Sequence, residues 1–145
     1  MFRIEYKIIT EQPEEIEYIS DEEIRYNFLL GNVSLISSDA EIEMEWEWIP
    51  LLDFAYCLQM IVSSLKGKDT AKEYFEFTEN PETLGFSRQG EQLKIVASFS
   101  SIVIKAIFAD FEKAVYDFHF SISEYIRANI SSELPSILQN YLLVE

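Results

Sequence analysis

Four glutamates at alternate positions form the clearest charged pattern in this 145-residue sequence. Residues 41–48 read EIEMEWEW, so carboxylates alternate with Ile, Met and Trp side chains. On a β-strand, alternate side chains share a face and lie about 6.7 Å apart, which would produce a linear row of carboxylates. Such a row can form charge-assisted hydrogen bonds with Arg and Lys side chains of another protein. We therefore predict a partner-binding surface made by Glu41, Glu43, Glu45 and Glu47.

The same row has a second interpretation, in which it belongs to the internal structure of the sheet. Like charges on one strand face are tolerated best when Lys or Arg side chains stand opposite them on neighbouring strands. Arg25 and Lys94 are the candidate internal partners. The sequence leaves both interpretations open.

Residues that carry out nucleophilic or acid–base catalysis are scarce. His119 is the only histidine, and Asp117 would not face it on a helix because it lies two positions away. Cys57 is the only cysteine and lies in the most apolar segment, where a thiol behaves as a small hydrophobic group. We predict no catalytic residues and no enzymatic activity.

Cofactor and metal sites also lack sequence support. The 4 glycines are scattered, so no phosphate-binding loop is present. One Cys and one His are too few ligands for a zinc site, and no calcium-binding loop pattern occurs. We predict that the protein holds neither a cofactor nor a metal ion.

The charge balance points to a class of partner. The chain holds 26 acidic and 11 basic residues, a formal net charge of −15, and half of the acids lie in residues 1–50. This charge repels nucleic acids and anionic membranes and attracts basic proteins. The first ten residues lack the apolar core of a signal peptide, and the longest apolar stretch, 49–62, is too short to span a bilayer. We expect a cytoplasmic location.

The elements that position the glutamate row follow from periodicity. Alternation predicts strands at about 2–9 and 40–48, and a strand over 24–30 that turns at Gly31-Asn32 into 33–36. A helix over 21–30, capped by Ser20 with Glu23 as its capping-box partner, is the competing prediction.

The rest of the chain divides into a helix, a run of strands and two further helices. Pro50 and Gly67 bracket an apolar helix over 51–65, with Asp53, Gln59, Ser63 and Ser64 marking its water-facing part. Asp110 is predicted to cap a helix that runs to about 130, and Ser131 or Ser132 to cap the last one. Between them, strands are predicted at 73–78, 83–88, 91–98 and 101–107.

This order predicts a single α+β domain over residues 1–145. We expect a largely antiparallel sheet of about seven or eight strands in two meanders, with three helices packed mainly on one face. A small-ligand-binding protein or hydrolase with a pocket beneath the helices is an alternative function. Aromatic residues of the second meander would then line the pocket, although core and cross-strand packing is the main interpretation of them: Tyr74, Phe75, Phe77, Phe86 and Phe99. A homodimer through Leu138, Leu142 and Leu143 of the last helix is a further alternative.

Three segments resemble a group of small bacterial proteins that includes acidic immunity proteins and antitoxins. The segments are IRYNFLLGNVSL (24–35), EWEWIPLLDFAYCLQMIV (45–62) and FEFTENPETLGFSRQGEQLKIV (75–96). The resemblance implies a non-catalytic protein that blocks a basic toxin, and it transfers no individual functional residue.

Overall fold

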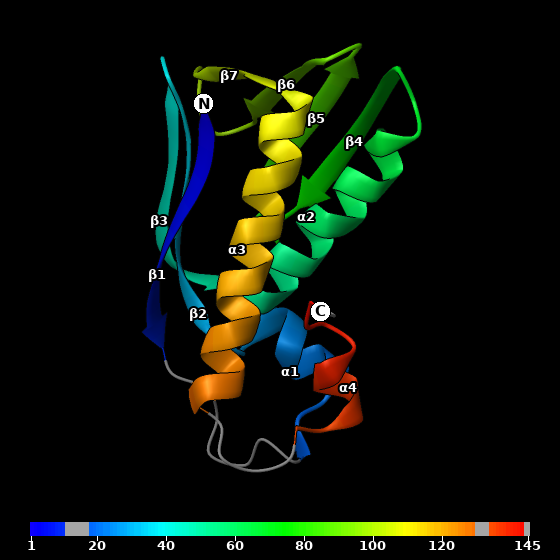
Figure 1. Ribbon diagram of the computed structural model, residues 1–145. Helices are drawn as coiled ribbons and strands as arrows, with labels where there is room; N and C mark the ends of the chain where they lie inside the picture. The colour runs from blue at the N-terminus through cyan, green and yellow to red at the C-terminus, as the bar shows by residue number, and fades with distance from the viewer. Residues whose placement is uncertain (11–17, 130–133, 144–145) are drawn as a thin grey trace.

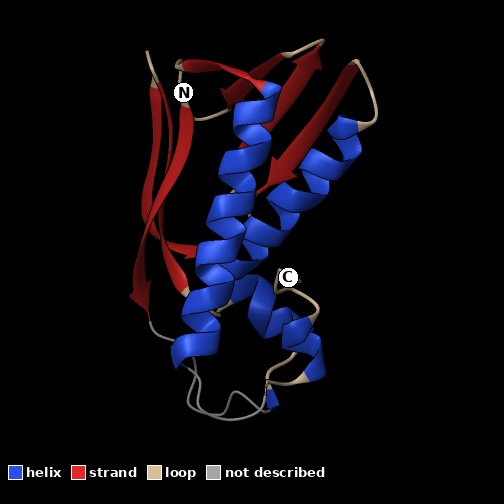
Figure 2. Ribbon diagram, viewed as in Figure 1, coloured by secondary structure: helices blue, strands red, loops and turns tan. Residues whose placement is uncertain are grey.

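Seven strands and four helices are present in residues 1–10, 18–129 and 134–143, the part of the chain that the computed structural model describes. The strands form two antiparallel sheets, in the orders β1-β2-β3 and β4-β5-β6-β7 (Figures 1 and 2). The elements are β1 (Phe2–Thr10), α1 (Asp21–Tyr26), β2 (Leu30–Ser37), β3 (Glu41–Pro50), α2 (Leu51–Lys66), β4 (Thr70–Glu76), β5 (Thr83–Gln89), β6 (Gln92–Ala97), β7 (Val103–Ile107), α3 (Phe108–Asn129) and α4 (Ser136–Gln139).

The predicted α+β class and the antiparallel pairing are confirmed. The two meanders form separate sheets of three and four strands, whereas one largely antiparallel sheet was expected. The helix α2 lies between them in the chain, starting directly after Pro50 and ending before Gly67 as predicted. The three-helix prediction was one short for the described residues, because a helix forms where a strand was expected.

The strand predicted over 24–30 was wrong, and the competing helix is the better description. Helix α1 begins after Ser20, whose hydroxyl accepts a hydrogen bond from the Glu23 backbone N–H at 3.1 Å. Ile24 and Phe28, four positions apart, are fully buried, so the apolar residues serve a helical face and the turn after it. Leu29 then adopts a positive φ of 54°, which reverses the chain into β2.

Gly31-Asn32 is not a turn, because both residues lie inside β2. Gly31 pairs with Ile8 of β1 and Ile49 of β3. A Cβ atom at Gly31 would lie 2.1 Å from the backbone oxygen of Lys7, so only glycine permits this approach of β1. The glycine therefore reflects strand packing, not chain reversal.

The helices α2 and α3 lie side by side and cover the inner faces of the two sheets (Figure 1). The ring of Phe54 on α2 contacts that of Phe75 on β4 at 4.9 Å between centroids. On α3, the Phe111 ring contacts both Phe2 of the first sheet and Phe86 of the second, at 5.6 and 5.5 Å. Buried apolar side chains from both sheets and all four helices form one continuous core.

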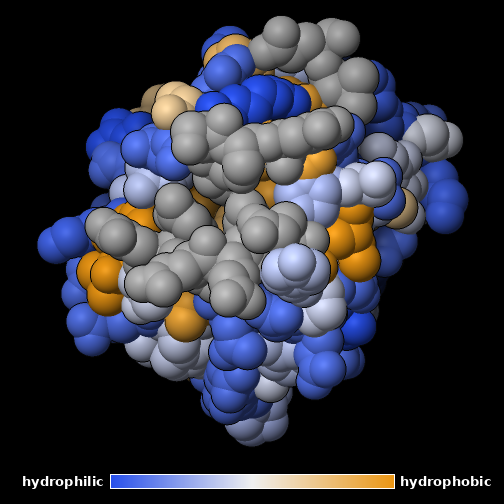
Figure 3. All heavy atoms as spheres, turned by 90° about the horizontal axis from the view of Figure 1, so that it is seen from below, coloured by the Kyte–Doolittle hydropathy of each residue, from blue (hydrophilic) through white to orange (hydrophobic). Residues whose placement is uncertain are grey.

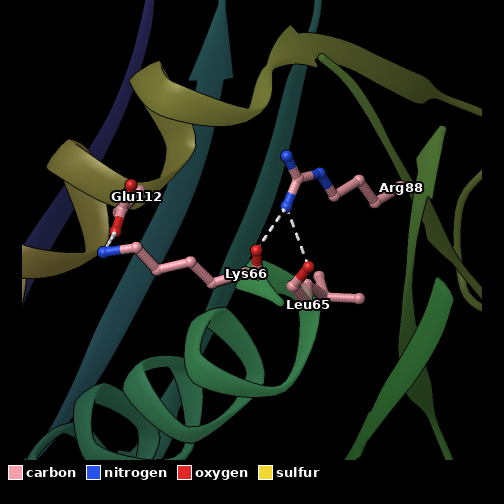
Figure 4. Close-up of polar contacts among 4 residues, drawn as sticks. All are labelled: Leu65, Lys66, Arg88 and Glu112. Atoms are coloured by element: carbon pink, nitrogen blue, oxygen red, sulfur yellow. Dashed lines mark hydrogen bonds and ion pairs between the residues drawn. The ribbon is translucent and has the colours of Figure 1, made fainter. Parts of the chain in front are cut away.

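An arginine ties the end of α2 to the second sheet (Figure 4). Arg88 on β5 donates hydrogen bonds to the backbone oxygens of Leu65 and Lys66, at 2.9 and 3.1 Å. These carbonyl groups belong to the last turn of the helix, where few backbone donors remain, and the Leu65 oxygen also accepts from the Lys68 backbone N–H at 3.2 Å. The side chain of Lys66 pairs with Glu112 of α3 at 2.8 Å, so the same turn is linked to both neighbours.

Two predicted helix caps have different outcomes. Helix α3 begins at Phe108 directly after β7, so Asp110 lies inside its first turn and the predicted cap was wrong. A carboxylate in that position still interacts favourably with the helix dipole. Ser131 and Ser132 lie outside the described residues, and α4 begins after Pro135.

Candidate functional site

The predicted glutamate row lies on β3, an outer strand of the three-stranded sheet. Glu43, Glu45 and Glu47 are exposed and Glu41 is half-buried, while Ile42 and Met44 between them are buried. The alternation therefore places carboxylates and apolar side chains on opposite faces, as predicted for the first part of the strand. The outer face of this sheet is the candidate site.

A bulge interrupts the row before its last member. Val33 of β2 pairs with Met44, but Gly31, two residues earlier, pairs with Ile49, five residues later. The extra residues of β3 include Glu47, which has a positive φ of 68°. Its backbone N–H donates to the Asn32 side-chain oxygen at 2.7 Å, which holds the bulge in place. Glu47 is thus displaced from the regular row formed by the other three glutamates.

The bulge also shapes the apolar side of the strand. The rings of Trp46 and Trp48 stack at 5.3 Å between centroids and are half-buried. Trp46 makes edge contacts with Phe77 and Phe99 of the second sheet's loops, at 5.0 and 4.8 Å. This aromatic group joins the two sheets behind the glutamate row.

The internal partners that the sequence offered do not pair with the row. Among residues 1–10, 18–129 and 134–143, no ion pair involves any of the four glutamates. Arg25 lies on α1, where its guanidinium stands 5.8 Å from the Tyr26 ring, and Lys94 lies on β6 of the other sheet. The carboxylates are therefore not compensated by these two cations.

Electrostatics within the row are repulsive. The Glu41 carboxyl lies beside that of Glu43 and raises the pKa of Glu43, through a shared hydrogen bond and through charge repulsion. On the strand pairing β1–β2–β3, Glu43 follows Ser34 and Glu5 in one cross-sheet line. Of the two acids in this line, Glu5 is the one that forms an ion pair within the described residues, with Arg3 at 3.4 Å. A second cation on this face, Lys7, lines a depression of about 190 Å³ together with Glu45.

His119 is buried in α3, and among the described residues no hydrogen bond or ion pair joins it to a carboxylate. Its Nε2 contacts the backbone oxygen of Tyr141 at 2.6 Å, and its buried Nδ1 has no partner among the described residues. Burial lowers the pKa of His119, with the Tyr141 carbonyl opposing this shift. The arrangement fixes the C-terminal segment on α3.

Asp53 departs from its predicted place at the water-facing side of α2, because it is buried. Burial raises the pKa of Asp53 to about 6, with Arg25 lowering it and Asp21 raising it further. The Cys57 sulfur lies 3.9 Å from an Asp53 oxygen, and burial raises the pKa of the thiol to about 12. A thiol with this pKa is not a nucleophile at neutral pH.

A groove of about 360 Å³ lies between β1 and α3. Its walls are mainly apolar and carry the side chains of Ile4 and Phe118, while Lys113 and Asp117 pair at 2.8 Å on its rim. Asp53, the carboxyl with the shifted pKa, does not line this groove. The groove and the perturbed carboxyl are therefore separate features.

The predicted aromatic pocket residues belong mainly to the core. Phe75, Phe77 and Phe86 are buried and Phe99 is half-buried, whereas Tyr74 is 65% exposed on the outer face of the second sheet. The rings of Phe75 and Phe77 contact each other at 4.9 Å. Core packing, the main interpretation of these residues, describes four of the five.

The residues of the homodimer alternative are mostly buried within their own chain. Leu138 and Leu142 are buried and Leu143 is half-buried. The Leu143 backbone donates to Ser123 at 2.9 Å and accepts from Arg127 at 2.6 Å, so α3 holds this segment. Apolar patches do lie between hydrophilic groups at the end of the molecule that carries α1 and α4 (Figure 3).

The roles of Arg88 and of three lysines on the second sheet were not predicted from the sequence. Arg88 was read only as part of a strand, although its long side chain reaches the end of α2. Lys72, Lys94 and Lys105 fall on one line across the second sheet, which follows from the register of its strands. The short Gly90-Glu91 connection indicates the β5–β6 register, so part of this line could have been found.

No helix within the described ranges is both long and apolar enough to cross a membrane. The same part of the chain contains no group of three or more His, Cys, Asp or Glu side chains placed to hold a metal ion. Comparisons with protein families, with curated proteins and with solved structures found no match to this chain.

Proposed function

We propose that this protein is a non-catalytic binding module that holds a basic protein partner on the outer face of its three-stranded sheet. Glu41, Glu43, Glu45 and Glu47 are the proposed contacts. One observation carries the proposal: these carboxylates stand on an outer strand with no ion pair to any described cation. Repulsion between Glu41 and Glu43 adds to the argument, because a cationic partner would relieve it.

The charge of the whole chain supports a basic partner. A net charge of −15 attracts cationic proteins over a distance and accelerates their association. The regular part of the row, Glu41 to Glu45, repeats about every 6.7 Å, which is also the spacing of alternate side chains on an extended peptide. An extended segment with Arg or Lys at alternate positions would therefore present one cation to each carboxylate.

The resemblance to acidic immunity proteins and antitoxins makes a basic toxin the proposed partner class. A toxin that acts on nucleic acid has a cationic groove, which a carboxylate row can occupy in place of phosphates. The proposal includes a cytoplasmic location and a bacterial source. Nucleic acids and anionic membranes are not proposed as partners, since the net charge repels both.

A direct test uses a fluorescein-labelled eight-residue peptide of alternating Arg and Val. Replacing all four row glutamates by Gln should weaken binding roughly tenfold to hundredfold, since exposed ion pairs contribute about 0.2–1 kcal/mol each. The salt dependence of binding should also become shallower. A matched control replaces four exposed glutamates outside the row by Gln, with the same change in net charge: Glu22, Glu76, Glu79 and Glu91.

The control separates a specific row from general attraction. It should retain wild-type affinity within about twofold, because its glutamates are dispersed over other elements. Equal losses in both variants would mean that only net charge attracts the peptide, and the proposed row would be wrong. Affinity purification from the native source then uses the wild type, the glutamate-row variant and the control variant as bait. It identifies a partner whose binding depends on the row.

The groove between β1 and α3 favours one alternative, a small-ligand-binding protein. Its volume of about 360 Å³ lies within the usual range of ligand pockets. A thermal-shift screen against metabolites tests this function, because a ligand that binds the folded state raises the melting temperature. A specific shift that disappears in Ala114→Trp, which would fill the groove, would replace the protein-binding proposal.

A further inference from the structure

Three lysines form a line across the exposed face of the four-stranded sheet. Lys72 on β4 pairs with Ser87 on β5, Ser87 pairs with Lys94 on β6, and Lys94 pairs with Lys105 on β7. Residues that pair directly across antiparallel strands share a face. All three lysines are exposed, and we call them the lysine row. With strands about 4.8 Å apart, the row extends over roughly 14 Å.

The lysine row is unusual in a protein with this charge. The chain has 26 acidic and 11 basic residues, yet three of its lysines share one face. Lys94 and Lys105 stand directly opposite each other, an arrangement that destabilises a sheet. Within the described ranges, none of the three takes part in an ion pair. Asp39 of the β2–β3 turn lines a neighbouring depression together with Lys105 but forms no ion pair with it.

The surface around the lysine row has the features of a contact surface. The row lines a depression of about 440 Å³, with Gln89 and Gln92 at its border. Beside it runs an apolar line in which Tyr74 pairs with Gly85, Gly85 with Val96, and Val96 with Val103. Tyr74, Val96 and Val103 are 65, 41 and 40% exposed. Cations and apolar groups thus lie in parallel lines on an uncovered sheet face.

We propose that the outer face of the β4–β7 sheet docks an acidic, partly apolar segment of another protein. Carboxylates of that segment contact the lysine row, and its apolar side chains pack on Tyr74, Val96 and Val103. About four residues of extended chain cover the length of the row. This surface is distinct from the glutamate row, which lies on the other sheet and has the opposite charge. The inference does not depend on the proposed function.

Charge and composition favour a protein segment over a nucleic acid. Nucleic-acid surfaces usually neutralise more phosphates than three lysines can, and the net charge of −15 opposes a long polyanion. Single-stranded nucleic acids also stack on several aromatic rings, whereas Tyr74 is the one aromatic residue in the paired lines described above. A short acidic segment brings fewer charges and uses the apolar line as well.

The test measures the binding of a fluorescein-labelled eight-residue peptide of alternating Glu and Val by fluorescence anisotropy. Replacing Lys72, Lys94 and Lys105 by Gln should weaken binding at least tenfold. The matched control replaces three other exposed lysines by Gln, for the same change in net charge, and should bind within twofold of the wild type: Lys7, Lys68 and Lys113. Tyr74→Ser should weaken binding several-fold. The variant with four Gln in the glutamate row should bind this peptide no more weakly than the wild type.

Several results would overturn the proposal. One is the absence of binding by the wild type at several hundred micromolar peptide. Another is an equal loss of peptide affinity in the lysine-row variant and in the control variant with Lys7, Lys68 and Lys113 replaced. Tighter binding of oligo-thymidylate, lost in the lysine-row variant, would identify a nucleic-acid surface instead. Displacement of the peptide by millimolar inorganic phosphate would identify a small-anion site. Sedimentation tests whether the protein associates with itself. Self-association that weakens with salt, and that is lost both in the lysine-row variant and in the glutamate-row variant, would identify a second copy of the chain as the occupant. Far-UV circular dichroism of each variant checks that the fold is retained.

Discussion

Arg88 should contribute more to the stability of this protein than any exposed basic residue. Its Nε donates to the Gly90 backbone oxygen at 2.8 Å, and one terminal nitrogen donates to the Leu65 and Lys66 oxygens. The guanidinium also lies over the Phe108 ring, 4.0 Å from its centroid. The perturbation is Arg88→Ala, which removes all four contacts and leaves the Lys66 oxygen without this donor, while the Leu65 oxygen keeps the Lys68 backbone N–H at 3.2 Å.

The expected loss follows from these contacts. A typical hydrogen bond contributes about 1 kcal/mol net, and a charged donor contributes somewhat more. The cation–π contact contributes about 0.5–1 kcal/mol at a site that solvent reaches. Because Arg88 is half-buried and its contacts share one side chain, the sum is smaller than full additivity suggests. We expect the free energy of unfolding to fall by about 2–4 kcal/mol.

The assay is equilibrium urea unfolding followed by far-UV circular dichroism. Arg88→Lys keeps the charge but not the planar fork of donors, so it should recover less than half of the loss. Arg3→Ala, which removes an exposed arginine paired with Glu5, is the control and should change stability by less than about 0.5 kcal/mol. Full recovery by Arg88→Lys, or a loss in Arg88→Ala no larger than in the control, would refute the reasoning.

Two further changes test the interior. Burial raises the pKa of Asp53 to about 6, so the folded state holds its proton more tightly than the unfolded state, and the stability that this provides is lost as pH rises from about 4 to 6. Asp53→Asn should therefore be more stable than the wild type by about 1–3 kcal/mol at pH 8 and by less at pH 5, in urea unfolding at both values. The exposed Asp39→Asn should show no such difference. Trp46→Ala should lower the free energy of unfolding by about 3 kcal/mol, because three aromatic contacts are lost, whereas a loss below 1 kcal/mol would mean that the aromatic group does not join the sheets.

The sequence predicted those parts of the fold in which local pattern and tertiary packing agree. The regular part of β3 is the clearest case, since Glu and apolar residues alternate and the strand has one buried face. Residues 24–30 show the opposite. Their alternation favoured a strand, but the Ser20 cap and the four-residue spacing of Ile24 and Phe28 favoured a helix, and burial of these two side chains decided the outcome.

The sequence predicted the strand that carries the four glutamates but not the surroundings of that strand. Whether Arg25 or Lys94 compensates the glutamates depends on where the fold places α1 and β6 relative to β3, and no local pattern contains that information. The bulge at Glu47 was also beyond reach, because the residues 41–48 alternate without interruption in the sequence. Asp53 was misplaced for a similar reason, since a single acid on an apolar helix is normally at the surface.

The stacked pair of tryptophans determines what optical measurements on this protein can report. Trp46 and Trp48 are the only tryptophans in the chain, and both lie where the two sheets meet. Intrinsic tryptophan fluorescence therefore reports on that junction. It does not report unfolding that is confined to α1 or to the C-terminal segment. Circular dichroism, by contrast, averages over all helices and strands. If the two signals change at different urea concentrations, the sheets separate in a step of their own, and the single core does not unfold as one cooperative unit.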